Sequence, residues 1–124
     1  MLAASAGLGV LMGVPRTPPT PQEVEEQRAA HLEHLARGEL LGALEDYRLD
    51  HGDWPPGGAG DGLESALAPY VHPLPENPSN GRSDVRFLRP GDRMPAPDGT
   101  SGWVFDPETG ELRSNAAGER RGDA

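Results

Sequence analysis

The strongest constraint on the fold is a single long helical period with recognisable start and stop signals. Residues 15–21 read PRTPPTP and cannot be helical throughout, because each proline removes a backbone donor and restricts its predecessor. Thr20 then fits an N-cap, a proline occupies the first helical position, and Glu23 completes a capping box. Gly52 is the expected stop. Between them, apolar residues recur at spacings of three and four: Leu32, Leu35, Ala36, Leu40, Ala43, Leu44 and Tyr47.

The core available to this helix is small. Only 22 of the 124 residues are Leu, Val or Phe and none is Ile, while Gly 17 and Pro 14 make up a quarter of the chain. This composition allows one domain and argues against a large buried catalytic cavity. A helix of about 30 residues is roughly 45 Å long, so we expect so small a domain to cover only part of it.

Charge and cysteine content exclude further classes. The net charge of −9 and the pI near 4.8 argue against a nucleic-acid partner, which needs a basic surface. The absence of Cys removes disulfides, thiol nucleophiles and Cys-ligated zinc, but leaves the cellular compartment open.

After the long helix, the sequence predicts a second short helix, an ordered loop and three strands. Asp61 and Glu64 frame the short helix, and turns are expected at 77–78 and 80–81 in the loop 72–82. The helix has an apolar face of Leu63, Ala66, Leu67 and Tyr70. The strands are expected at 84–89, 102–106 and 111–115, with a turn at 106–110 that closes the last two into a hairpin.

This order predicts an α+β fold, in which a long N-terminal amphipathic helix packs on a small three-stranded antiparallel sheet beside a short second helix. The chain divides into an apolar and proline-rich segment (1–20), a globular domain (21–115) and a disordered tail (116–124).

Three segments in this order resemble the major pseudopilins of type II secretion systems and related type IV pilin-like proteins. The first ends the long helix and contains Glu45, Tyr47, Asp50, His51, Gly52, Trp54 and Pro55. The second follows the short helix and contains Leu74, Pro75, Asn77, Pro78 and Gly81. The third, GWVFDPETGELRSN, is similar to the closing hairpin of the family and includes Trp103, Phe105, Pro107 and Gly110.

The resemblance implies a pilin-like fold and a structural subunit rather than an enzyme. Its partners would be copies of itself, other pilin-like subunits and secretion-system assembly proteins, in the bacterial cell envelope. Residues 2–14 are apolar but shorter than the roughly 20 residues that span a membrane, and they resemble the second half of the family's anchor. A start upstream of Met1 would make the chain a membrane-anchored filament subunit. A true start at Met1 would make it a soluble extracytoplasmic binding or adaptor module.

Few residues suggest chemistry of their own. His31 and His34 share a helix face at a spacing that can bind a metal, but a solvated surface explains them better because no third ligand lies nearby. No nucleophile motif is present. Oxygen-bearing side chains gather in and beside the loop between the first two strands, and hard oxygen ligands suit Ca²⁺. They are Asp92, Asp98, Thr100, Ser101 and Asp106.

The resemblance also implies calcium in this loop, although the family's ligand spacing is not clearly reproduced, and an acidic solvated loop is the alternative. The two tryptophans likewise allow two interpretations. Trp54 and Trp103 could stack on a ligand, but in a protein with so few core residues packing is the stronger interpretation.

Overall fold

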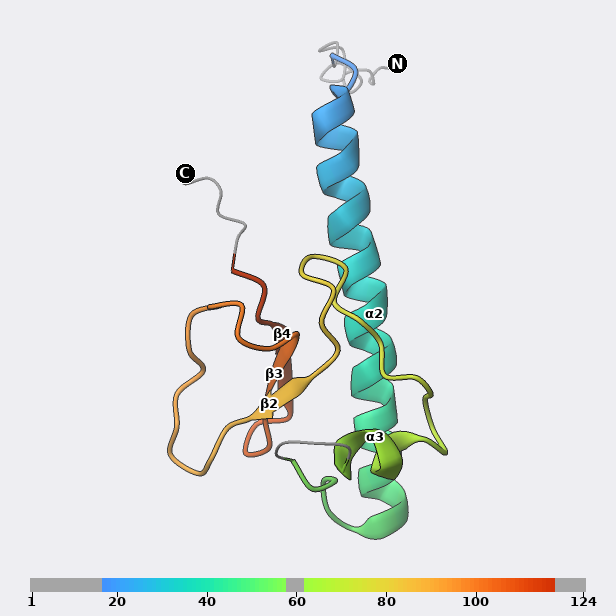
Figure 1. Ribbon diagram of the computed structural model, residues 1–124, viewed down its shortest axis with the longest axis vertical. Coiled ribbons are helices and arrows are strands. Elements are labelled where there is room, and N and C mark those ends of the chain that lie inside the picture. The colour runs from blue at the N-terminus through green and yellow to red at the C-terminus, as the bar shows by residue number, and fades with distance from the viewer. Residues whose placement is uncertain (1–16, 58–61, 118–124) are drawn as a thin grey trace, which may run out of the picture.

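The computed structural model describes residues 17–57 and 62–117. It contains a long helix α2 (Pro21–His51), a short helix α3 (Gly62–Leu67) and strands β2 (Val85–Phe87), β3 (Trp103–Asp106) and β4 (Glu111–Ser114). The sheet and α3 lie beside the C-terminal half of α2, and the N-terminal half extends beyond them (Figure 1). We call the described residues after Gly52 the head. Two predicted segments lie largely outside the described residues. They are residues 1–16 of the predicted N-terminal segment 1–20, and residues 118–124 of the predicted tail 116–124.

Both predicted ends of α2 are confirmed. The Thr20 hydroxyl accepts from the Glu23 amide at 3.0 Å, and the Glu23 carboxylate accepts from the Thr20 amide at 2.9 Å. At the other end, Gly52 has φ 84° and its amide donates to the Arg48 carbonyl. This left-handed conformation suits glycine and explains why the helix stops there.

The sheet is mixed, so the prediction of an antiparallel meander is wrong for its first pair. β3 and β4 pair antiparallel, with Phe105 opposite Leu112, and form the predicted hairpin. β2 instead pairs parallel to β3, with Phe87 opposite Phe105. The long connection 88–102 carries the chain back to the end of the sheet at which β2 began. β3 therefore starts beside the start of β2 and runs in the same direction. All three strands are also shorter than predicted.

The core lies between α2, α3 and one face of the sheet. Leu40 and Leu44 of α2 are fully buried, as are Trp103 and Phe105 of β3. Leu63 and Leu67 of α3, with Val71, Leu74, Val85 and Leu112, complete this cluster. The buried part of α2 is therefore confined to its C-terminal half, as the small supply of apolar residues leads us to expect.

Gly102 lets two backbone segments approach each other at the start of β3. Its amide donates to the Asp84 carbonyl at 3.0 Å, and a Cβ atom in its place would lie 2.7 Å from the carbonyl carbon of Arg82. Asp84 also accepts from the Arg82 guanidinium, which lowers the pKa of Asp84. The glycine before Trp103 is thus required by packing.

Candidate functional site

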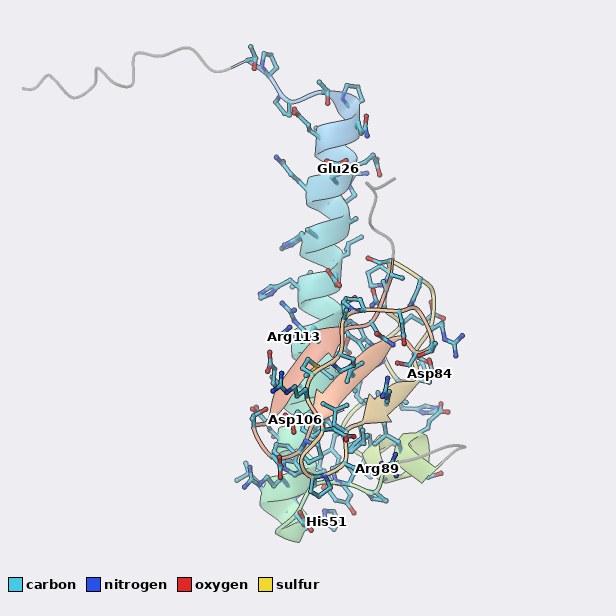
Figure 2. All side chains as sticks on the ribbon, turned by 90° about the vertical axis from the view of Figure 1, so that its left-hand side faces the viewer. Glu26, His51, Asp84, Arg89, Asp106 and Arg113 are labelled. Carbon is cyan, nitrogen blue, oxygen red and sulfur yellow. The ribbon has the colours of Figure 1, made fainter. Side chains whose placement is uncertain are left out.

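The N-terminal half of α2 is an uncovered helical arm. Residues 21–32 are all exposed, and Val24, Leu32 and Leu35 retain 36%, 46% and 53% of their accessible surface. In Figure 2, Glu26 lies on the part of the helix that stands clear of the head, and His51 lies at the opposite end. The arm therefore carries large apolar side chains that nothing in the head covers.

The two histidines of this arm do not form a metal site with other described residues. His31 and His34 are both exposed, and the Arg37 side chain lies 3.4 Å from Nδ1 of His34. Within residues 17–57 and 62–117 there is no group of three or more His, Cys, Asp or Glu side chains placed to hold a metal ion. In the same residues no helix has the length and apolar character needed to cross a membrane.

Trp54 joins the end of α2 to the hairpin turn. Its indole N–H donates to the Pro107 carbonyl at 3.0 Å, and its ring meets Phe105 edge to face at 4.8 Å between centroids. The Arg48 guanidinium covers the same ring, 4.6 Å from its centre. Trp54 of the first motif segment therefore contacts Phe105 and Pro107 of the third, with Gly110 beneath the ring.

An open groove runs along this end of α2. It has a volume of about 560 Å³ and is lined by Glu45, Arg48, Leu49, Gly52 and Trp54. Leu49 is 82% exposed. This is the highest exposed fraction among the large apolar side chains of the described residues. The groove thus combines an apolar side chain with one acidic and one basic group.

Tyr47, Asp50 and Tyr70 hold α2 to the segment after α3. The Tyr70 hydroxyl donates to the Asp50 carboxylate at 2.7 Å, and the two tyrosine rings meet edge to face at 6.2 Å. This hydrogen bond to a carboxylate raises the pKa of Tyr70 to about 12, because ionised Tyr70 would lose it and face a like charge. The His51 ring stacks on the Tyr47 ring.

Asn77 is a buried polar anchor for the loop 72–82. Its side-chain amide donates to the Gly102 carbonyl at 2.8 Å and to the Ser114 hydroxyl at 2.7 Å. Its side-chain oxygen accepts from the Ser79 amide at 2.9 Å. The resemblance placed Asn77 in a motif, and the structure shows that it joins the loop to β4 and to the residue before β3.

Trp103 packs rather than presenting a stacking surface. It is fully buried, and its indole N–H donates to the Pro75 carbonyl at 3.1 Å. Leu74 is buried in the same cluster as Trp103, and Pro55 is buried as well, whereas Pro78 is exposed. Of the two tryptophans, only Trp54 is partly exposed.

The predicted calcium residues separate into three places. Asp98 accepts from the amide and hydroxyl of Thr100, and both Asp98 and Ser101 accept from the side-chain amide of Asn115. Asp92 accepts from the Arg89 amide within its own turn. Asp106 accepts from the Glu108 amide in the hairpin turn and is largely buried. Only Asp98, Thr100 and Ser101 are thus linked to one another.

Asn115 is the organising residue that sequence reasoning missed at this loop. It is almost completely buried, and its side-chain oxygen also accepts from the Asp98 amide at 3.1 Å. The bonds from Thr100, and then that from Asn115, lower the pKa of Asp98 by favouring its ionised form. The network keeps an exposed carboxylate charged, which a cation would require, and calcium binding there stays a prediction.

Comparisons of this chain with models of protein families, with curated proteins and with solved structures give no match.

Proposed function

We propose that the chain is a structural subunit of a filament, with a pilin-like fold most similar to that of the major pseudopilins of type II secretion systems. The observation that carries the proposal is the uncovered arm of α2. Residues 21–32 are exposed throughout although Val24 and Leu32 are large and apolar. A helix that extends beyond its own core with large apolar side chains exposed offers surface for another chain to cover. The arm would be buried between subunits, and its partners would be copies of the chain and related subunits.

The motif residues support the same proposal through their positions in the head. Gly52 ends the helix, Trp54 joins that end to the hairpin turn, and Asn77 joins the following loop to the sheet. These three motif positions therefore each have a structural task in the head. The proposed setting is the bacterial envelope, with secretion-system assembly proteins as further partners.

The first test is the mature form of the native protein. Intact mass and N-terminal residue would be determined on material recovered from an envelope fraction. A mass above 13.2 kDa, with an N-methylated first residue upstream of Met1, supports the filament subunit. A soluble species of 13.2 kDa that begins at Met1 overturns it.

A second test uses the arm directly. Leu32→Glu places a charge on the surface that would be buried in the filament, and we expect it to abolish filament assembly while the head stays folded. Leu32 is 46% exposed in the single chain, so the variant removes little from the head itself. The matched control is Ala30→Glu, an exposed position of the same arm without a large apolar side chain. Filaments formed equally by both variants would contradict the proposed role of the arm.

The groove beside Trp54 favours one alternative, a soluble extracytoplasmic binding or adaptor module. The exposed Leu49, the half-buried Trp54 and the oppositely charged side chains of Glu45 and Arg48 line a surface suited to a partner. The soluble 13.2 kDa species described above is the result that favours this alternative.

A further inference from the structure

The C-terminal end of α2 places its most exposed leucine beside the open groove. Leu49 is 82% exposed, and it lines the groove of about 560 Å³ together with Glu45, Arg48, Gly52 and Trp54. Pockets that hold a ligand have volumes of roughly 300–1,000 Å³. The groove is therefore large enough to take side chains of a partner, and Leu49 and the half-buried Trp54 offer them apolar contacts.

Three carboxylates surround Leu49. Glu45 and Asp46 lie one turn before it, and the helical period places them on either side of it. Asp53 lies just after the end of the helix, where its carboxylate accepts from the Trp54 amide at 2.8 Å. All three side chains are exposed, and none of them forms an ion pair with another described residue. The exposed leucine is thus bordered by negative charge that the described part of the chain does not pair.

The sign of this charge selects the class of partner. Arg48 is the one cation that lines the groove, and its guanidinium lies 4.6 Å from the centre of the Trp54 ring, whose face attracts it. One positive charge therefore stands against three negative ones at this end of the helix. The whole chain has a net charge of −9, so a second copy, a nucleic acid or an anionic lipid surface would be repelled, whereas a cationic partner would be attracted.

We propose that this groove binds a basic polypeptide segment of another protein, in which Arg or Lys residues flank one large apolar side chain. The apolar side chain lies against Leu49 and Trp54, and the basic groups reach Glu45, Asp46 and Asp53. An apolar centre with a polar, solvent-accessible rim is the usual anatomy of a protein interface. Because the rim charges are exposed, binding should weaken with added salt. The inference goes beyond the proposed filament and does not rest on it, since the groove lies at the opposite end of α2 from the arm.

Titration of the isotope-labelled chain with a defined peptide, followed by NMR, tests the place of binding. The probe is a synthetic peptide in which two Arg residues stand on either side of one Leu, and two control peptides replace the Leu by Ser or every Arg by Glu. We expect the Trp54 indole N–H and the Leu49 amide to shift, while the indole N–H of Trp103, which is fully buried and bonded to the Pro75 carbonyl, stays in place. Both control peptides should bind at least about tenfold more weakly. No binding of the probe, equal binding of the Ser peptide, or shifts spread over all exposed carboxylates overturns the proposal.

Substitution of Leu49 tests the apolar contact. Leu49→Ser removes the side chain that the partner would cover, and we expect the probe peptide to bind at least about tenfold more weakly. The matched control is Leu35→Ser, which makes the same change at a 53% exposed position of the same helix outside the groove, and it should leave the affinity unchanged. Equal affinities of the two variants would overturn the proposed site.

A second pair of variants separates a specific site from attraction by net charge. Asp46→Asn and Glu26→Gln each remove one exposed carboxylate, the first beside Leu49 and the second on the arm. Asp46→Asn should weaken binding of the probe peptide at low salt and have a smaller effect at high salt, whereas Glu26→Gln should have little effect at either. The same loss in both variants would overturn the proposal, and it would leave filament assembly by the arm unaffected as a separate question.

Discussion

Replacing Asn77 by Ala tests whether a buried amide joins the loop 72–82 to the sheet. The substitution removes two donated bonds, to the Gly102 carbonyl and the Ser114 hydroxyl, and one accepted bond from the Ser79 amide. A buried neutral hydrogen bond contributes about 1 kcal/mol net, and the lost packing adds to this. The Gly102 carbonyl keeps its bond from the Asn115 amide, which limits the loss. We expect the free energy of unfolding to fall by about 2–4 kcal/mol.

The matched control is Asn80→Ala in the same loop. The Asn80 side chain also donates to a carbonyl, that of Ser101, and accepts from the Arg82 amide, but it is only half-buried. Water can replace these bonds, so we expect a loss of no more than about 1 kcal/mol. A small domain loses roughly 4–8 °C in melting temperature per kcal/mol, which separates the two variants clearly.

Urea unfolding followed by tryptophan fluorescence measures both variants, because Trp103 is fully buried in the folded chain. The slope of the transition should not change, since the surface exposed on unfolding is almost the same. Equal midpoints for the Asn77 and Asn80 variants would refute the argument that burial makes Asn77 the stronger anchor.

Three further outcomes are expected. Gly102→Ala should lower the melting temperature, because the added Cβ atom meets a backbone carbonyl. Gly38→Ala has open space around it and should stabilise the helix by up to about 1 kcal/mol. A higher melting temperature for Gly102→Ala than for Gly38→Ala would contradict this. The pKa of Asp98 is lowered in the folded chain, so its ionised form adds stability above about pH 4, and this stability is lost as the pH falls through the folded pKa. In a plot of the free energy of unfolding against pH, Asp98→Asn should therefore make the fall on the acid side less steep. The same fall in both proteins would argue against this role of Asp98. If the loop binds calcium, about 10 mM Ca²⁺ should raise the melting temperature of the wild type but not of Asp98→Asn; no rise in the wild type rejects a calcium site.

Local chemistry is what made the elements predictable. Thr20 and Glu23 satisfy each other's amides, and Gly52 adopts a left-handed conformation, so both helix ends depend on residues within one turn. The hairpin turn is equally local, since the Gly110 amide donates to the Asp106 carbonyl. Strand direction has no such local signature. The alternation of apolar and polar residues shows which side chains of a strand share a face. Whether β2 runs parallel or antiparallel to β3 depends instead on the path of the connection 88–102.

Buried polar residues were the other feature that sequence patterns did not reveal. Asn77 and Asn115 are among the most buried residues of the head, yet asparagine is a residue type expected at the surface. Their partners lie far along the chain, at residues 102 and 114 for Asn77 and at 98 and 101 for Asn115. No local pattern links such pairs, so the polar anchors emerge only from the fold.

The uneven cover of α2 has a measurable consequence for its stability. The helix is roughly 46 Å long, but its buried side chains are Leu40, Ala43 and Leu44, and the arm before them makes no core contact beyond Ala36. Isolated helices of this length are marginal in water, and a cap adds only about 1 kcal/mol. In dilute monomer we therefore expect the amides of residues 25–34 to exchange hydrogen at least about 100-fold faster than those of residues 43–50. Assembly should slow exchange in the arm, because burial between chains supplies the packing that the head does not. Equal protection along the whole helix of the dilute monomer would show that the arm is stable alone, and the physical reason for a partner would disappear.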